Sequence, residues 1–204
     1  MQALPQAAFL LFLEAAVGGA IALFWVHLRG EVSHGFTLFT GVCFWLCAAL
    51  AVWLRLAFPP VVLGADLFWF AAERAFSLAF LALLGAYLVG LRASAARGVF
   101  AALAPLVPLL GLGGLWSAGL VDPSAQLGGV GTPLAELAGA IALGSALTGL
   151  SLGHWYLVSP SLSVRPLIRL TFVCLTALVS QVVLLLLLLL LPGAPSAAVS
   201  SLVG

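Results

Sequence analysis

Long apolar segments separated by short polar turns dominate this sequence. The apolar segments cover residues 7–28, 35–57, 68–91, 98–120, 134–157 and 166–191. Each is close to the length of about 20 apolar residues that a helix needs to cross the hydrocarbon of a membrane. The segments are continuously apolar and do not alternate, which argues against a membrane β-barrel. We therefore predict an all-α polytopic membrane protein: one domain over residues 1–204, folded as a bundle of six transmembrane helices with short loops.

The composition supports this class and narrows the partners. Of the 204 residues, 64% are hydrophobic and only 6% are charged, whereas a soluble domain carries about a quarter charged residues. Such a chain cannot cover a water-facing surface, so the lipid bilayer is its first partner. We expect other membrane protein subunits beside it. A net charge of +1 argues against nucleic-acid binding, and the absence of a basic stretch before Glu14 argues against a cleaved signal peptide.

The arginines predict the orientation, because the chain contains no lysine. Arg29 lies in the first turn between segments, Arg92 and Arg97 border the third turn, and Arg165 and Arg169 lie at the fifth. Positive side chains are retained on the cytoplasmic side of membranes. We therefore expect a multi-pass protein of the bacterial inner membrane with both termini outside the cytoplasm.

Two polar side chains fall well inside the predicted spans. Glu14 lies about 10 Å from the outer end of the first span by helical rise, and Gln181 reaches a similar depth on the last span. A bare carboxylate in hydrocarbon costs several kcal/mol, so we expect Glu14 to be protonated, paired or beside water. Two interpretations stay open: a hydrogen bond that joins helices, for example to Gln181, and a site that carries protons or cations.

Charged residues also gather where the second and third spans meet. Arg55, Asp66, Glu73 and Arg74 lie at the outer ends of these spans, which a short turn joins. We predict an ion pair between Arg55 and either Glu73 or Asp66 that fixes the hairpin.

A cluster of aromatic and basic side chains is expected at the cytoplasmic side. The span 134–157 carries small residues at every fourth position, which let another helix or a flat cofactor approach closely. Two histidines from different helices can ligate haem b, an arginine can pair with its propionates, and a quinone needs only one histidine. Ordinary anchoring at the lipid headgroups is the alternative. The predicted cofactor-binding residues are His154, His34, His27, Trp155, Tyr156 and Arg169.

No sequence motif identifies a reaction. HExxH, P-loop and GxSxG patterns are absent from the sequence, and Ser151 near His154 has no acid to orient the histidine. Cys43, Cys47 and Cys174 form no CxxC pair, so we interpret them as packing residues. We predict no catalytic and no metal-binding residue, and the sequence leaves open whether the protein is an enzyme.

Two functional hypotheses follow. The first is a small integral subunit of a redox or electron-transfer complex, which contacts quinone or haem at the cytoplasmic side or acts as a scaffold there. The second is a compact transporter or channel subunit that uses Glu14 and the fourth span, which prolines and glycines break between Pro105 and Gly114. The sequence favours the first, because the polar side chains cluster at one interface rather than along a path across the membrane.

The predicted topology is testable with reporter fusions. Fusions after residues 95 and 127 should report opposite compartments, with residue 95 in the cytoplasm and residue 127 outside, because arginine retains the odd-numbered turns inside. A cytoplasmic reporter at residue 127 would overturn the predicted orientation.

Overall fold

The structure, a computed structural model, describes residues 3–59, 66–92, 104–121, 131–158 and 163–190. Within these residues the regular structure is all helical, which confirms the predicted fold class. The helices are α1 (Ala3–Leu28), α2 (His34–Ala57), α3 (Leu67–Arg92), α5 (Leu106–Ala118), α6 (Gly131–Val158) and α7 (Arg165–Leu190). Five of them are long and apolar enough to cross a membrane. The chain is a multi-pass integral membrane protein.

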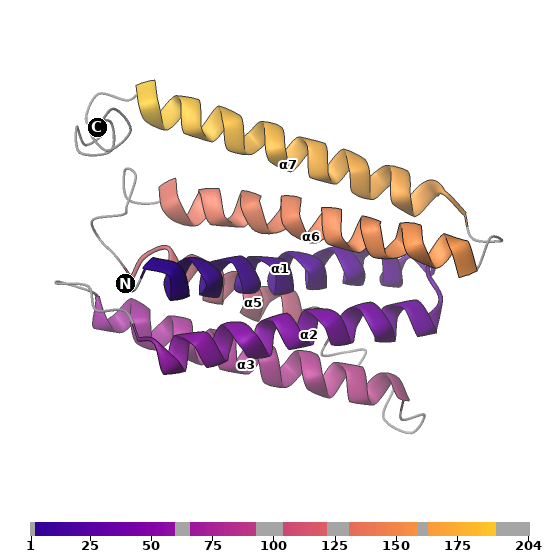
Figure 1. The fold of residues 1–204 in the computed structure, drawn as a ribbon, viewed down its shortest axis with the longest axis horizontal. Coiled ribbons are helices and arrows are strands. Elements are labelled where there is room, and N and C mark those ends of the chain that lie inside the picture. Colours follow the sequence, from indigo (N-terminus) through magenta and orange to yellow (C-terminus); the bar gives the residue numbers. More distant parts are fainter. Residues whose placement is uncertain (1–2, 60–65, 93–103, 122–130, 159–162, 191–204) are drawn as a thin grey trace.

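The helices lie side by side, and the chain runs back and forth along them (Figure 1). The first turns of α1, α3 and α6 and the last turn of α7 share one end of the bundle, here named the N end. The opposite end, where α1 ends and α2 begins, is named the far end. Which side of the membrane each end faces stays a prediction.

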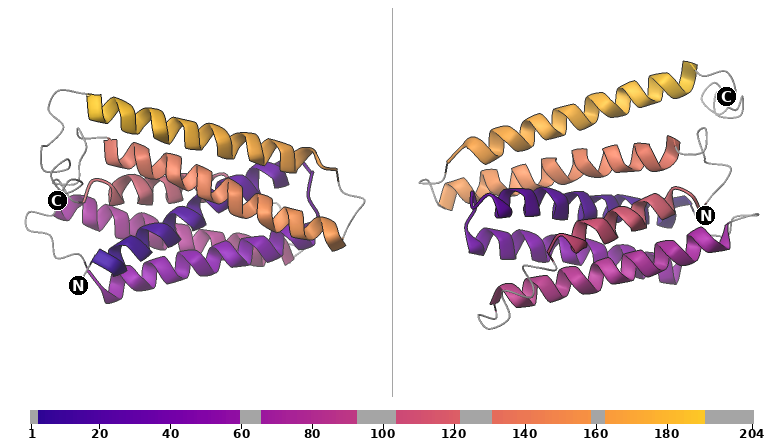
Figure 2. Two further views of the ribbon diagram at one scale, coloured as in Figure 1. Left: turned by 45° about the horizontal axis from the view of Figure 1, so that its top comes forward. Right: turned by 180° about the vertical axis from the view of Figure 1, so that it is seen from behind.

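The structure describes only part of the fourth predicted span, and the helix in that part is shorter than the span that the sequence predicts. Helix α5 has 13 residues, about 20 Å of helix, which is less than the roughly 30 Å of hydrocarbon. It covers the part of the bundle next to the N end (Figure 2). Residues 98–103 of the predicted span lie outside the described residues.

Helix α1 is the centre of the bundle. Its most apolar stretch is 61% buried, against 33% for α6 and 11% for α7. It packs against α2, α5 and α6, while α7 packs mainly against α6 and α3 against α5 and α2. The low burial of α7 leaves its leucine-rich surface for lipid.

The closest helix contact joins α1 to α6 through two glycines. A Cβ built on Gly18 would lie 1.7 Å from the Ala140 carbonyl oxygen, and one on Gly144 would lie 1.9 Å from the Gly18 carbonyl carbon. The two backbones therefore touch directly, as small residues allow between membrane helices. The sequence placed this close approach on the stripe that includes Gly149 and Gly153. That stripe instead faces α7 loosely, since a Cβ on Gly153 would meet nothing within 4 Å.

We expect Gly18→Ala to lower the free energy of unfolding by about 1–3 kcal/mol or more, because the added methyl group must push two backbones apart. Gly153→Ala is the matched control and should be neutral or slightly stabilising, since alanine favours helix and finds open space. Unfolding of the purified protein by a denaturing detergent measures both changes. Equal effects at the two positions would contradict the packing described here.

Candidate functional site

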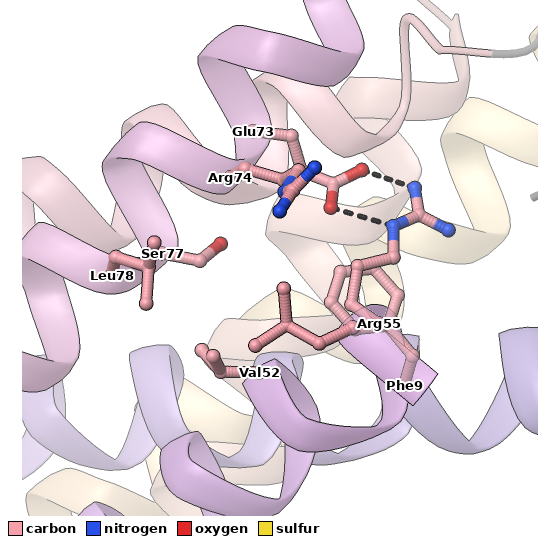
Figure 3. A pocket seen from close by; sticks show the side chains of 8 residues that line it. Phe9, Val52, Arg55, Glu73, Arg74, Ser77 and Leu78 are labelled. Carbon is pink, nitrogen blue, oxygen red and sulfur yellow. Dashed lines mark hydrogen bonds and ion pairs between the residues drawn. The ribbon is translucent and has the colours of Figure 1, made fainter. Parts of the chain in front are cut away.

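A buried ion pair joins α2 to α3 near the N end. The Nε atom of Arg55 donates to Glu73 Oε1 at 2.7 Å, and Nη2 donates to the second carboxylate oxygen (Figure 3). Glu73 is 0% exposed and Arg55 is 8% exposed. The ring of Phe9 on α1 lies 4.4 Å from the guanidinium carbon, a cation–π distance. This pair confirms the ion pair that the sequence predicts for the hairpin.

Asp66, the other predicted partner of Arg55, caps the next helix. Its Oδ1 accepts a hydrogen bond from the Phe68 amide at 2.9 Å, which is the usual role of an aspartate before a helix. With α3 starting at Leu67, Glu73 falls in its second turn, opposite Arg55 in the last turn of α2. The ion pair thus joins the last turn of α2 to the second turn of α3.

Glu14 and Gln181 meet on the surface of α6. A Cβ built on Gly139 would lie 3.2 Å from Glu14 Oε1 and 3.0 Å from Gln181 Nε2. The two residues that the sequence placed at one depth are therefore close in space. The hydrogen bond of Gln181 Nε2 goes to the Ala135 carbonyl oxygen at 3.4 Å, rather than to the Glu14 carboxyl group.

Glu136 is the site residue that the sequence analysis missed. It lies on α6 one turn before Gly139, and its Oε2 is buried with no hydrogen-bond partner among the described residues. A Cβ on Gly119, directly after α5, would lie 2.9 Å from this oxygen. Glu14 lies against Gly139, one turn further along α6 from Glu136. Glu136 lies close to the predicted start of the span at residue 134. A charged residue at that position is expected at the membrane surface, so the sequence offers no reason to place it in a buried site.

These four side chains form what we name the carboxyl cluster: Glu14 from α1, Arg55 from α2, Glu73 from α3 and Glu136 from α6. The cluster holds three carboxyl groups and one guanidinium, and that guanidinium is bonded to Glu73. The described residues contain no group of three or more His, Cys, Asp or Glu side chains that could hold a metal ion. The cluster therefore has more carboxyl groups than its one arginine can pair with. Its described side chains also do not form a group that could chelate a metal ion.

The three histidines face different neighbours near the far end. His27 Nδ1 lies 3.1 Å from Thr37 Oγ1 on α2, and its ring meets the edge of Tyr87 on α3. His34 is the exposed first residue of α2, while His154 is exposed on α6. Within the described residues, the structure shows no pocket that two histidines share.

The other predicted cofactor-binding residues are engaged by the protein. Trp155 packs edge-on against Phe36. The hydroxyl of Tyr156 donates to the Ser163 carbonyl oxygen. Arg169 forms an ion pair with Glu31, which ties the first turn of α7 to the loop after α1. These contacts anchor the far end of the bundle.

Among the predicted cofactor-binding residues, His154 lines a groove. The groove lies between α6 and α7 and has a volume of about 480 Å³. The small-residue stripe of α6 forms one wall, and α7 forms the other. Its lining includes Ser145, Gly149, Gly153, His154, Leu170 and Cys174. The groove therefore lies beside His154, on the face of α6 that points to α7.

Comparisons with protein-family models, with curated proteins and with solved structures found no match for this chain. Functional inference therefore rests on the geometry of the described residues.

The burial of the Arg55–Glu73 pair generates a stability prediction. Arg55→Met should lower the free energy of unfolding by about 3–5 kcal/mol, because it strands a buried carboxylate. The double variant Arg55→Met with Glu73→Leu should recover much of that loss, since no charge is left unpaired. Detergent-induced unfolding measures each variant.

The control for this prediction is the partly exposed pair Arg169–Glu31, with side chains 38% and 19% exposed. Arg169→Met should cost less than Arg55→Met, because this pair is partly exposed, even though Glu31 Oε2 is buried without a hydrogen-bond partner among the described residues. If Arg169→Met destabilised as strongly as Arg55→Met, burial would not be the cause.

Proposed function

We propose that this protein carries protons or small cations within the membrane through the carboxyl cluster. The observation that supports this most strongly is the buried Glu136 Oε2, which has no hydrogen-bond partner among the described residues and lies one turn from Gly139, where Glu14 meets α6. This is the second of the functions that the sequence suggests. The geometry favours it over the first, because it adds Glu136 and Glu73 to the lone Glu14.

The charge balance of the cluster is the physical basis of this proposal. Arg55 is bonded to both oxygens of Glu73, so its positive charge is already paired with that carboxylate. Glu14 and Glu136 then share an apolar region without a cation of their own. Like charges in such a region disfavour each other, and each unpaired carboxylate costs several kcal/mol. Binding a proton or a cation relieves both costs, and releasing it restores them.

Helix α5 forms one side of the cluster. It packs against α1, α3 and α6, and Gly119 at its end lies against Glu136.

Buried hydroxyl groups lie between the cluster and the far end. Thr40 on α2 and Thr148 on α6 are 1% and 0% exposed, and neither Oγ1 has a hydrogen-bond partner in the described part of the chain. One turn nearer the start of α2, the hydroxyl group of Thr37 contacts the ring of His27. From Glu136 to Thr148 the helical rise is about 18 Å. We propose that entering water bridges this stretch during transfer.

A second candidate function retains the redox hypothesis for one site. The groove beside His154 has a volume of about 480 Å³, within the range of roughly 300–1,000 Å³ for small-molecule sites. A quinone ring needs one histidine hydrogen bond and a flat apolar slot, and the glycines of α6 leave such a slot open. Haem b held by two histidines has no such support. A role as a subunit of an electron-transfer complex rests on this groove alone.

The carrier function is tested by proton flux. We expect the protein in liposomes to dissipate an imposed pH gradient, measured with an entrapped pH-sensitive dye. Glu136→Gln should reduce the rate by roughly tenfold or more, because an amide cannot take up a proton. Glu14→Gln should reduce it as well.

The matched control is Glu31→Gln at the far end, which removes a carboxyl group outside the cluster and should retain the flux. Each variant is first checked for wild-type unfolding behaviour. Wild-type flux in folded Glu136→Gln would contradict the proposal, and flux of sodium or potassium in place of protons would assign the cluster to a metal cation.

The quinone site is tested by binding. A fluorescent short-chain quinone analogue should bind the wild-type protein, and His154→Ala should weaken binding about tenfold, the effect of one lost hydrogen bond of about 1.4 kcal/mol. His34→Ala is the control and should bind as the wild type does. Equal binding by both variants would exclude His154 as a ligand.

A further inference from the structure

A small cavity lies beside the Arg55–Glu73 pair, between α1, α2 and α3 (Figure 3). Its volume is about 10 Å³, close to the space that one water molecule requires. The polar side chains in its lining are Arg55, Glu73, Arg74 and Ser77, and the remaining walls are apolar. The cavity is therefore too small for an organic ligand and has enough polar groups for a water molecule.

Ser77 is the side chain that points to an occupant. It is 4% exposed, and its Oγ has no hydrogen-bond partner among the described residues. A helical serine usually donates to the carbonyl oxygen four residues earlier, as Ser151 does to Leu147 and Ser180 does to Thr176 in this protein. Ser77 makes no such bond. Figure 3 shows its hydroxyl directed toward the side of the cavity that holds Glu73.

We propose that this cavity binds a single water molecule through Ser77 Oγ and the Glu73 carboxylate. A buried water typically makes about three hydrogen bonds. The Ser77 hydroxyl offers one, and each Glu73 oxygen keeps a free lone pair beyond its bond to Arg55. The guanidinium of Arg74, which is placed against the Phe70 ring, supplies further donors on the same lining.

The charges of the lining favour a neutral occupant. An anion in the cavity would meet the Glu73 carboxylate, and a cation would meet the guanidinium groups of Arg55 and Arg74. Both ions would also lose their hydration against Phe9 and Val52, which line the apolar side. Water satisfies the exposed donors and acceptors without adding charge.

The bound water would extend the carboxyl cluster toward α5. Ser77 faces Gly114 of α5, since a Cβ built on Gly114 would lie 3.1 Å from Ser77 Oγ. A water between Ser77 and Glu73 would provide a site for proton transfer beside the ion pair. This consequence rests on the proposed function, whereas the water site itself does not.

A structure of the protein in lipid nanodiscs, at a resolution that shows ordered waters, tests the proposal. We expect a density peak about 2.7–3.2 Å from Ser77 Oγ and from a Glu73 oxygen. The peak should vanish in Ser77→Ala and persist in Ser145→Ala, a control in which the removed hydroxyl already donates within its own helix.

Two results would overturn the proposal. One is a wild-type structure without the peak, in which the Ser77 hydroxyl group has rotated to donate to the backbone carbonyl oxygen of Glu73. The other is a peak that stays at full height in Ser77→Ala. Both are read from static structures, so they remain distinct from a failure of proton flux.

Discussion

A charge inside the hydrocarbon of a membrane must be paired or neutralised, and this bundle contains three carboxyl groups around one arginine. The pairing of Arg55 with both oxygens of Glu73 satisfies two of the four charges. We propose that Glu14 and Glu136 are neutralised by a proton or a cation that binds and is released. Fixed ion pairs hold helices together, whereas exchangeable neutralisation is what a carrier needs.

The packing of α1 makes this arrangement possible. Gly18 and Gly144 let the backbones of α1 and α6 touch, and that contact brings Glu14 and Glu136 toward each other from two helices. A larger residue at either glycine would separate the helices and weaken the electrostatic interaction between the carboxyl groups. The stability of the bundle and the chemistry of its cluster therefore depend on the same contact.

The sequence predicts the helices and the hairpin ion pair well, because both follow from local properties. The length of an apolar run marks a span, and the short turn between α2 and α3 limits which residues can face Arg55. The rotation of a helix about its own axis does not follow from the sequence of that helix alone, because it depends on the helices packed against it. Adjacent residues on a helix point about 100° apart, so His154 faces α7 while Trp155 packs against Phe36 on α2. Whether His27, His34 and His154 converge depends on three such rotations at once, so it stays a prediction. Glu136 was missed for a simpler reason, since α6 begins at Gly131 rather than at the predicted residue 134.

The protonation state of the cluster is the quantity that tests the central claim most directly. Infrared spectroscopy of the protein in lipid detects the carbonyl stretch of a protonated carboxyl group, which the ionised form lacks. At neutral pH we expect this band in the wild-type spectrum, weakened in Glu136→Gln or in Glu14→Gln and unchanged in Glu31→Gln. A spectrum without the band at neutral pH, or a band that survives both cluster substitutions at full strength, would contradict an exchangeable proton at this site.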